Sequence, residues 1–315
     1  MRFTVEPWAP DYGAPAGELE PSGAQVEIAV ERPEASWAPI PAAAEPARVV
    51  GFVDGVRRVD AQVWVADGDG QARLGLCASY AAGVAQCNGS CMVTRVEVRR
   101  ELLCPVGDLE PIHARHVTYT PRPRPGEGAE VLQVALQQRM RDLEIGVTAR
   151  AQGGLPSPGS ELLVVDGPLR GRQDLPNAVG FVKTHQVSYL PATVIEVVGR
   201  LAPGERTPLF AMTTSWSRYS WYLRLPGRGG HRWAGVARAE VSADLSMAEA
   251  RRLADLVTAT LPAYASAAHK DPRAPQNLYP IGGLERALRR RLGDPALLYR
   301  ALRAAAGSAL VPATV

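Results

Sequence analysis

Long apolar runs are missing from this 315-residue sequence. No stretch approaches the roughly 18 consecutive apolar residues that predict a membrane-spanning helix. The first residues, "MRFTVEPWAPDYGAP", also lack the apolar core of a signal peptide. We therefore expect no membrane span and a cytoplasmic location.

Cysteine is scarce as well. In the cytoplasm the few cysteines are expected to be reduced. Their spacing is irregular for a zinc ribbon or finger, so packing as small apolar side chains is favoured over zinc binding. The four residues are Cys77, Cys87, Cys91 and Cys104.

Net charge is small, at +3, and no run of lysines or arginines predicts a nucleic-acid-binding tail. Any basic surface must therefore be assembled by the fold. The hydrophobic share of 46% is typical of a globular protein, and the length suffices for one large domain or two ordinary ones.

Residues 1–46 are rich in proline and alanine and predict an extended arm, followed by one main domain over residues 47–315. Within the arm, "AQVEIAVER" alternates like a strand. Trp8 and Trp37 are expected to be exposed there, where they could anchor a partner protein or a second copy of the chain.

Residues 48–104 predict strands joined by tight turns, and hence antiparallel neighbours. The first run, "RVVGFVD", ends at Asp54 and is followed by Gly55. Two interpretations stay open for this pair: a hairpin turn, or a metal ligand at the end of a strand. Residues 106–126 predict a loop, in which His113 and His116 are a weaker metal-binding pair.

The next segment, up to about residue 152, predicts a long helix. Glu144 lies on the flank of its apolar stripe, so it should face the core rather than open water. The stripe is formed by Leu132, Leu136, Met140, Leu143 and Val147.

A second buried strand is predicted at residues 162–165, and it ends at Asp166 before a glycine. Because a helix separates the two buried runs, we expect this strand to be parallel to the first. Asp54 and Asp166 should then leave the same edge of the sheet. Further strands, one of them carrying Lys183, and three more helices complete the chain, with Ser246 and Glu249 predicted to cap the first of these helices.

This element order predicts an α/β fold of the ribonuclease H-like type, with a mixed sheet flanked by helices. Asp54, Glu144 and Asp166 would form an acidic triad on three separate elements. Carboxylates are the hard oxygen ligands that Mg²⁺ and Mn²⁺ prefer. Two such ions can bind the attacking water and the leaving oxygen of a phosphodiester.

Four segments in this order resemble the NurA family of nucleases that process DNA ends: "VVGFVDGVRR", "LLVVDGPL", "AVGFVKTHQVSYLP" and "NLYPIGGLERAL". The similarity runs from about residue 48 to about residue 290. It implies a metal-dependent DNA nuclease, acting as a 5′–3′ exonuclease, an endonuclease or both, with manganese preferred over magnesium. It also implies a homodimer that works with a hexameric HerA-type ATPase in DNA repair, DNA end resection or defence against phages.

The resemblance also implies roles for single residues. Asp54 and Asp166 resemble metal ligands, and Glu144 resembles the helix ligand, with Glu130 on the same helix as a rival. Lys183 would contact the scissile phosphate, or else only protect a strand edge.

Tyr279 would bind a phosphate or stack on a base, or else only pack. Where some relatives have a histidine two turns after that tyrosine, this chain has Ala287, and the nearest histidine is His269. Two alternatives to a nuclease remain: a catalytically idle protein of the same fold that binds DNA or the ATPase, and an unrelated β-rich ligand-binding protein.

Overall fold

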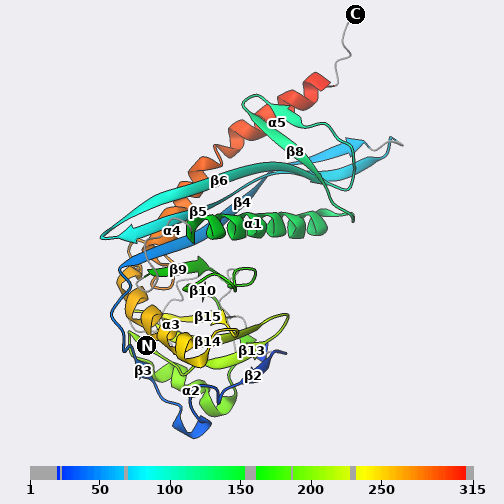
Figure 1. Ribbon diagram of the computed structural model, residues 1–315. Helices are drawn as coiled ribbons and strands as arrows, with labels where there is room; N and C mark the ends of the chain where they lie inside the picture. Colours follow the sequence, from blue (N-terminus) through cyan, green and yellow to red (C-terminus); the bar gives the residue numbers. More distant parts are fainter. Residues whose placement is uncertain are drawn as a thin grey trace, which may run out of the picture. The chain divides into compact units, whose positions relative to one another are not determined.

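The computed structural model describes residues 20–21, 23–66, 70–152, 161–185, 187–227 and 232–309 (Figure 1). The chain forms two compact units, each built from three segments. Unit 1 comprises Met1–Val53, Ala85–Met92 and Gln152–Gly283, and unit 2 comprises Asp54–Val84, Val93–Ala151 and Leu284–Val315.

Unit 1 is built on a mixed sheet. Strand β9 is parallel to both β4 and β10, and the other neighbours are antiparallel. The order across the sheet is β2 (Gln25–Glu27), β13 (Phe210–Thr213), β14 (Ser217–Arg224), β15 (Val236–Ser242), β10 (Ala178–Val182), β9 (Glu161–Asp166) and the start of β4 (Val49–Ala66). Two-residue strands pair at its margins: β1 (Glu20–Pro21) with β11 (Val187–Ser188), and β3 (Ile40–Pro41) with β12 (Glu205–Arg206).

Helices cover the unit 1 sheet. Helix α2 (Ala192–Arg200) buries three valines in an apolar cluster that includes Phe210 and Tyr222. Helix α3 (Met247–Thr260) begins with the predicted capping box, in which Ser246 accepts from the backbone of Glu249 and the Glu249 side chain returns to Ser246. The single turns η1 (Glu34–Ser36) and η2 (Leu261–Tyr264) complete the unit.

Unit 2 consists of long strands with helices. Its strand order is the rest of β4, then β5 (Ala72–Asn88), β6 (Ser90–Cys104), β8 (Val117–Pro123) and β7 (Ile112–Ala114). Its helices are α1 (Ala129–Gln152), the part of α4 (Tyr279–Arg291) from Leu284 onward, and α5 (Pro295–Ala309).

Both faces of β5 are apolar, which explains why helices belong on each side of unit 2. Leu76 and Ala78 pack with Leu132 and Leu136 of α1. Cys77, between them in sequence, points the other way and packs in a cluster that includes Leu302 of α5. Successive residues of a strand alternate between faces, so one apolar run supplies two cores.

The predicted α/β class is confirmed: a large mixed sheet is flanked by helices, and β9 is parallel to β4. The helix predicted to end near residue 152 is α1, and its Glu144 is buried. The loop predicted over residues 106–126 is wrong in part, because the short strands β7 and β8 form there.

The hairpin-turn interpretation of Asp54 and Gly55 is also wrong. Strand β4 continues without a break through both residues to Ala66. Glycine and aspartate are common in turns, but here neighbouring strands of the sheet hold them extended. The two predicted strands are therefore one long strand that contributes to both units.

The described part of the N-terminal arm is packed, so the expectation of an exposed Trp37 is wrong. Trp37 is 6% exposed and donates from its indole nitrogen to the Ile28 carbonyl at 3.0 Å. The reason is tertiary: β2 pairs with β13, almost two hundred residues later in the chain. Trp8 lies outside the described residues, and the boundary at residue 46 stays a prediction.

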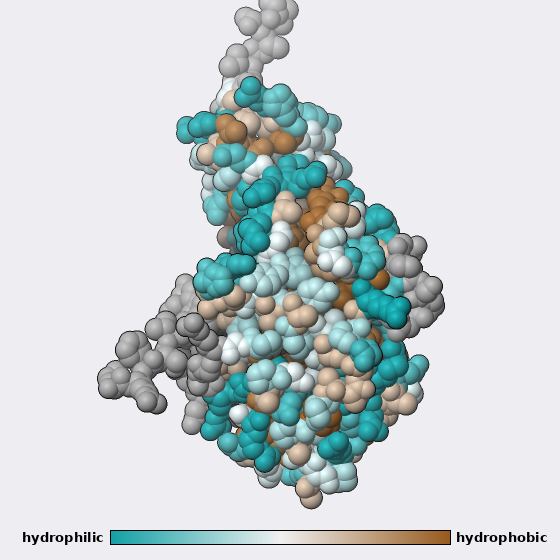
Figure 2. All heavy atoms as spheres, turned by 90° about the vertical axis from the view of Figure 1, so that its left-hand side faces the viewer, coloured by the Kyte–Doolittle hydropathy of each residue, from teal (hydrophilic) through white to brown (hydrophobic). Residues whose placement is uncertain are grey.

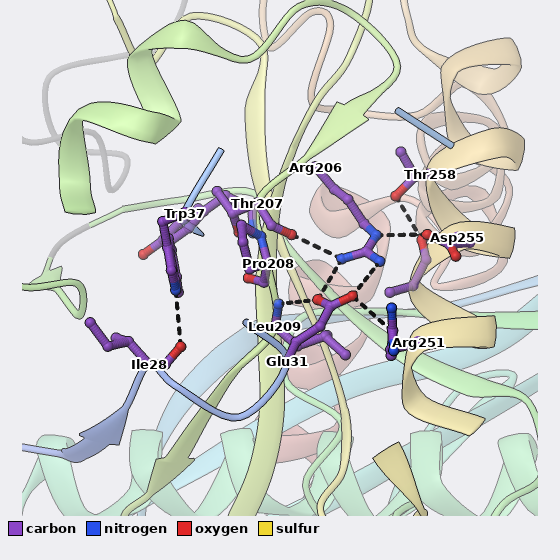
Figure 3. A network of polar contacts seen from close by, with 12 residues as sticks. Ile28, Glu31, Trp37, Arg206, Thr207, Pro208, Leu209, Arg251, Asp255 and Thr258 are labelled. Atoms are coloured by element: carbon purple, nitrogen blue, oxygen red, sulfur yellow. Dashed lines mark hydrogen bonds and ion pairs between the residues drawn. The ribbon is translucent and has the colours of Figure 1, made fainter. Parts of the chain in front are cut away.

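A buried network of ion pairs joins this arm to β12 and α3 of unit 1 (Figure 3). Arg206 binds the Glu31 carboxylate through both terminal nitrogens at 2.9 Å, and its Nε donates to Asp255 at 2.8 Å. The Leu209 N–H also donates to Glu31, at 2.6 Å. Burial raises the pKa of Glu31, but the hydrogen bonds and positive charge of Arg206 outweigh it and leave the pKa lowered.

The cysteines divide into two pairs. Cys87 and Cys91 form a disulfide, which corrects the expectation that all four are reduced. The two residues face each other across the tight β5–β6 connection, where Gly89 takes a positive φ of 71°. Cys77 and Cys104 are free and buried, as small apolar residues usually are.

The surface in Figure 2 shows hydrophobic atoms in separate areas among hydrophilic ones. Among the described residues, no helix combines the length and the apolar character needed to cross a membrane.

We expect Glu31→Gln to lower the free energy of unfolding by about 3 kcal/mol, because it leaves the buried Arg206 charge only partly compensated. Urea unfolding measures this, with the exposed Glu34→Gln as matched control. Since the pKa of Glu31 is lowered in the fold, its contribution is present above pH 4.5 and lost as pH falls through the folded pKa. If both variants lost the same free energy of unfolding at every pH, the prediction would be contradicted.

Candidate functional site

Asp166 is the last residue of β9, whose preceding residues Leu162–Val165 are buried. Gly167 then turns the chain with a φ of 96°, a conformation that favours glycine, and donates to the Phe181 carbonyl at 2.8 Å. The Asp166 side chain is therefore held at a rigid end of the sheet.

Lys183 follows β10 directly and lies beside this aspartate. Its Nζ is 2.6 Å from Asp166 Oδ2 and donates to Asn277 Oδ1 at 3.0 Å. The side chains of Lys183 and Asp166 are only 11% and 16% exposed. An ion pair so shielded is screened less by water and salt than a surface pair, which gives the ammonium group a defined position.

Asn277 extends these contacts and was not identified from the sequence. It is fully buried, and its amide nitrogen donates to Asp271 Oδ2 at 2.6 Å. Asp271 in turn accepts from the Arg273 N–H at 2.8 Å. Its sequence signal is its place at the start of "NLYPIGG", the motif that also contains Tyr279.

Tyr279 begins α4 and remains 40% exposed. Its hydroxyl oxygen accepts from the Ala267 N–H at 3.2 Å. The Lys270 ammonium lies 5.5 Å from the centre of its ring, within the range of a cation–π contact. These contacts pack Tyr279 against residues 267–270, which lie just before Asp271 in the chain.

Asp54 and Glu144 belong to unit 2. Asp54 Oδ1 accepts from the next backbone N–H, that of Gly55, at 2.7 Å. The Glu144 carboxylate packs against Gly55 so closely that a Cβ atom there would clash with Oε1 and lie 2.9 Å from Cγ. Only glycine leaves room for this carboxylate at the position that follows Asp54, so Gly55 belongs to the candidate site rather than to the turn that the sequence suggested.

Helix α1 is fixed to the sheet one and a half turns before Glu144. Arg139 binds Glu101 of β6 through Nε at 3.0 Å and Nη2 at 2.8 Å. Burial raises the pKa of Glu101, but its bonds to Arg139, Tyr80 and Arg122 outweigh this and lower the pKa. The ion pair sets the rotation of the helix and hence the direction of Glu144.

The alternative helix ligand and the candidate histidines are all on the surface. Glu130 is exposed and precedes Glu144 by 14 positions on α1, about 21 Å along a helix. His113, His116 and His269 are exposed. His113 Nδ1 lies 3.1 Å from the Thr118 hydroxyl.

The strand register relates the two aspartates. Val53 of β4 and Val165 of β9 are Cα partners in the parallel ladder. Asp166 is the residue after Val165 and ends β9, whereas Asp54, the residue after Val53, lies inside β4. The prediction that both aspartates end a strand is therefore wrong for Asp54. In the part of the chain that the structure describes, no group of three or more His, Cys, Asp or Glu side chains is arranged to hold a metal ion.

No protein-family model matches the sequence, and no curated protein sequence matches it. Among solved structures, a match is the crystal structure of the NurA nuclease from Sulfolobus solfataricus. The similarity covers 87% of each chain, with 11% sequence identity and a TM-score of 0.47.

We expect Gly55→Ala to lower the free energy of unfolding by about 1–3 kcal/mol, because the new methyl group overlaps the Glu144 carboxylate. The same substitution should cost little in a Glu144→Ala background. A double-mutant cycle by chemical denaturation measures this coupling. Additive effects would show that the two residues do not touch.

We expect Asn277→Ala to cost about 2 kcal/mol of stability, since it leaves buried partners without hydrogen bonds. The exposed Asn88→Ala is the matched control. If Asn277 holds Lys183, the double variant with Lys183→Met should lose less stability than the sum of the single variants. Thermal unfolding of the four proteins decides between coupling and independence.

Proposed function

We propose that this protein is a metal-dependent nuclease that hydrolyses phosphodiester bonds in DNA, with Asp54, Glu144 and Asp166 as metal ligands. The observation that carries the proposal is the Glu144 carboxylate, which lies on a buried helix face against Gly55, directly after Asp54. A glycine that makes room for a buried acidic side chain keeps a carboxylate close to the strand that carries Asp54, which a metal site on these elements would require.

The chemistry of these three side chains suits Mn²⁺ or Mg²⁺. All three side chains offer oxygen, and none offers the sulfur or imidazole nitrogen that zinc and copper favour. Mn²⁺ is the better candidate because Mg²⁺ demands near-ideal octahedral geometry and gives up its waters reluctantly. Two bound ions would supply an activated water and neutralise charge on the phosphodiester.

Lys183 would bind a phosphate oxygen of the substrate. Its ammonium group is already held between Asp166 and Asn277, so little side-chain freedom is lost on binding. A positive charge fixed beside the reacting phosphate stabilises the negative charge that develops there. The Tyr279 hydroxyl or ring, which is partly exposed, would contact a neighbouring phosphate or base.

The wider assignments rest on the sequence resemblance. The nuclease would act on DNA ends as an exonuclease, an endonuclease or both, as a homodimer fed with DNA by a hexameric HerA-type ATPase. Its cellular role would be DNA repair or defence against phages. The arm would contribute to these contacts through residues other than Trp37, whose side chain is buried.

We expect Asp54→Asn, Glu144→Gln and Asp166→Asn each to reduce cleavage of linear DNA at least about a hundredfold, because a lost charged ligand weakens metal binding. Cleavage is measured in Mn²⁺ and in Mg²⁺, with Glu130→Gln as the matched control that keeps activity. Thermal midpoints of Asp54→Asn and Glu144→Gln should not fall, since each removes one negative charge from the candidate site while it holds no metal. Asp166→Asn should be less stable, because it removes the carboxylate that pairs with the shielded Lys183 ammonium.

Full activity of Asp166→Asn would overturn the ligand assignment. An inactive Glu130→Gln beside an active Glu144→Gln would move the helix ligand to the first turn of α1. Binding without cleavage in the wild type, with and without the ATPase, would favour the catalytically idle alternative. Light scattering of the purified protein tests the homodimer.

A further inference from the structure

The C-terminal helices carry an unusual share of the positive charge. Residues 284–309 contain six arginines against two acidic residues, Glu285 and Asp294. Because the whole chain has a net charge of only +3, the rest of the molecule is slightly negative. The six arginines are Arg286, Arg289, Arg290, Arg291, Arg300 and Arg303; they are called the arginine face below.

The arginine face points to solvent. Leu284 and Leu288 of α4 and Leu292 directly after it are buried, and four of the arginines occupy the positions between them. In α5, Leu302 is buried while Arg300 and Arg303 are exposed. Residues three and four apart lie side by side on a helix, so Arg286, Arg289 and Arg290 form one cluster and the α5 pair another.

Most of this positive charge is not neutralised within the protein. Arg289 pairs with Glu285 at 2.8 Å. No described acidic side chain forms an ion pair with any of the other five arginines. Other arginines of the protein are held in buried ion pairs, as for Arg139 with Glu101 and Arg206 with Glu31.

Helix electrostatics explains only part of the pattern. Cations in the last turn of a helix interact favourably with its dipole, which accounts for the arginines at positions 289–291 of α4. Arg286 is in the middle of α4, and Arg300 and Arg303 are in the middle of α5. These three gain nothing from the dipole, so they call for another explanation.

The two helices present the charges from a fixed support. Arg58 of β4 donates to the Gly293 carbonyl at 2.8 Å, and Arg100 of β6 donates to the Leu292 carbonyl at 3.2 Å. These bonds satisfy carbonyl groups at the end of α4. Gly83 lets the helix approach β5, because a Cβ there would lie 3.0 Å from Leu288.

We propose that the arginine face binds the phosphate backbone of duplex DNA; this inference rests on the proposed nuclease function. Guanidinium groups bind phosphate through two parallel hydrogen bonds and are less strongly hydrated than ammonium groups. Rows of arginines about 5–6 Å apart on rigid helices match a polyanion. The face would supply the electrostatic capture of DNA that the low net charge of the whole chain does not predict.

The test is DNA binding measured without cleavage. Fluorescence anisotropy with a labelled 30-base-pair duplex in EDTA gives the affinity as a function of salt. The test variant replaces Arg286, Arg290, Arg300 and Arg303 by glutamine. The matched control removes the same charge from four other exposed arginines: Arg48, Arg115, Arg200 and Arg252.

We expect the test variant to lose about three to four units from the slope of log affinity against log salt, since each phosphate contact contributes about 0.9. Affinity near physiological salt should fall roughly tenfold or more, while the control changes little. A third variant with lysine at the four positions should keep the slope but bind more weakly, because lysine cannot form the paired bonds. Equal losses of DNA affinity in the test variant and the control would show that only the net charge matters. That result would overturn the proposal.

Two further outcomes separate this inference from the proposed function. A wild type that cleaves DNA, with unchanged binding in the test variant, overturns the arginine face alone. A wild type that binds DNA through these arginines but never cleaves it overturns the nuclease assignment alone. If the test variant binds DNA normally but no longer associates with the ATPase, the face is a protein-docking surface and the proposal is wrong.

Discussion

The parallel pairing of β4 with β9 is the interaction on which the proposed site depends. Val49–Val53 lie in register with Glu161–Val165, and both segments are mostly buried. Parallel strands need cover on both faces, and the burial of both segments shows that they have it. A slip of one residue would turn Asp166 to the opposite face, so core packing sets the direction of a polar side chain.

Charged groups have two different roles in this protein. Where they are buried, they are paired and join segments that are distant in sequence: Glu31 with Arg206, and Glu101 with Arg139. Breaking such a pair is costly because an uncompensated charge stays in a medium of low dielectric constant. Where arginines are exposed on α4 and α5, water and salt screen them, and they remain available for an external anion. A single net charge for the chain does not reveal this division.

Local pattern was sufficient for much of the fold. The apolar stripe of α1 predicted the helix and the inward direction of Glu144, because helical periodicity alone decides which residues share a face. The continuous apolar run before Asp166 predicted a strand buried on both sides, parallel to the first. The capping box at Ser246 is likewise a local signal, since its hydrogen bonds join residues three apart. The α/β class followed from the order of these elements.

Only the tertiary structure decided the rest. An aspartate followed by glycine suits both a turn and a strand, so neighbouring strands had to show that β4 continues through Asp54. Trp37 is buried by partners far along the chain, and Asn277 gains its role from Lys183, 94 positions away. The sequence by itself determined the long helices and the strand that ends at Asp166, because those are short-range preferences. The contacts of Gly55, Asn277 and the arginine face depend on long-range packing, which no local pattern contains.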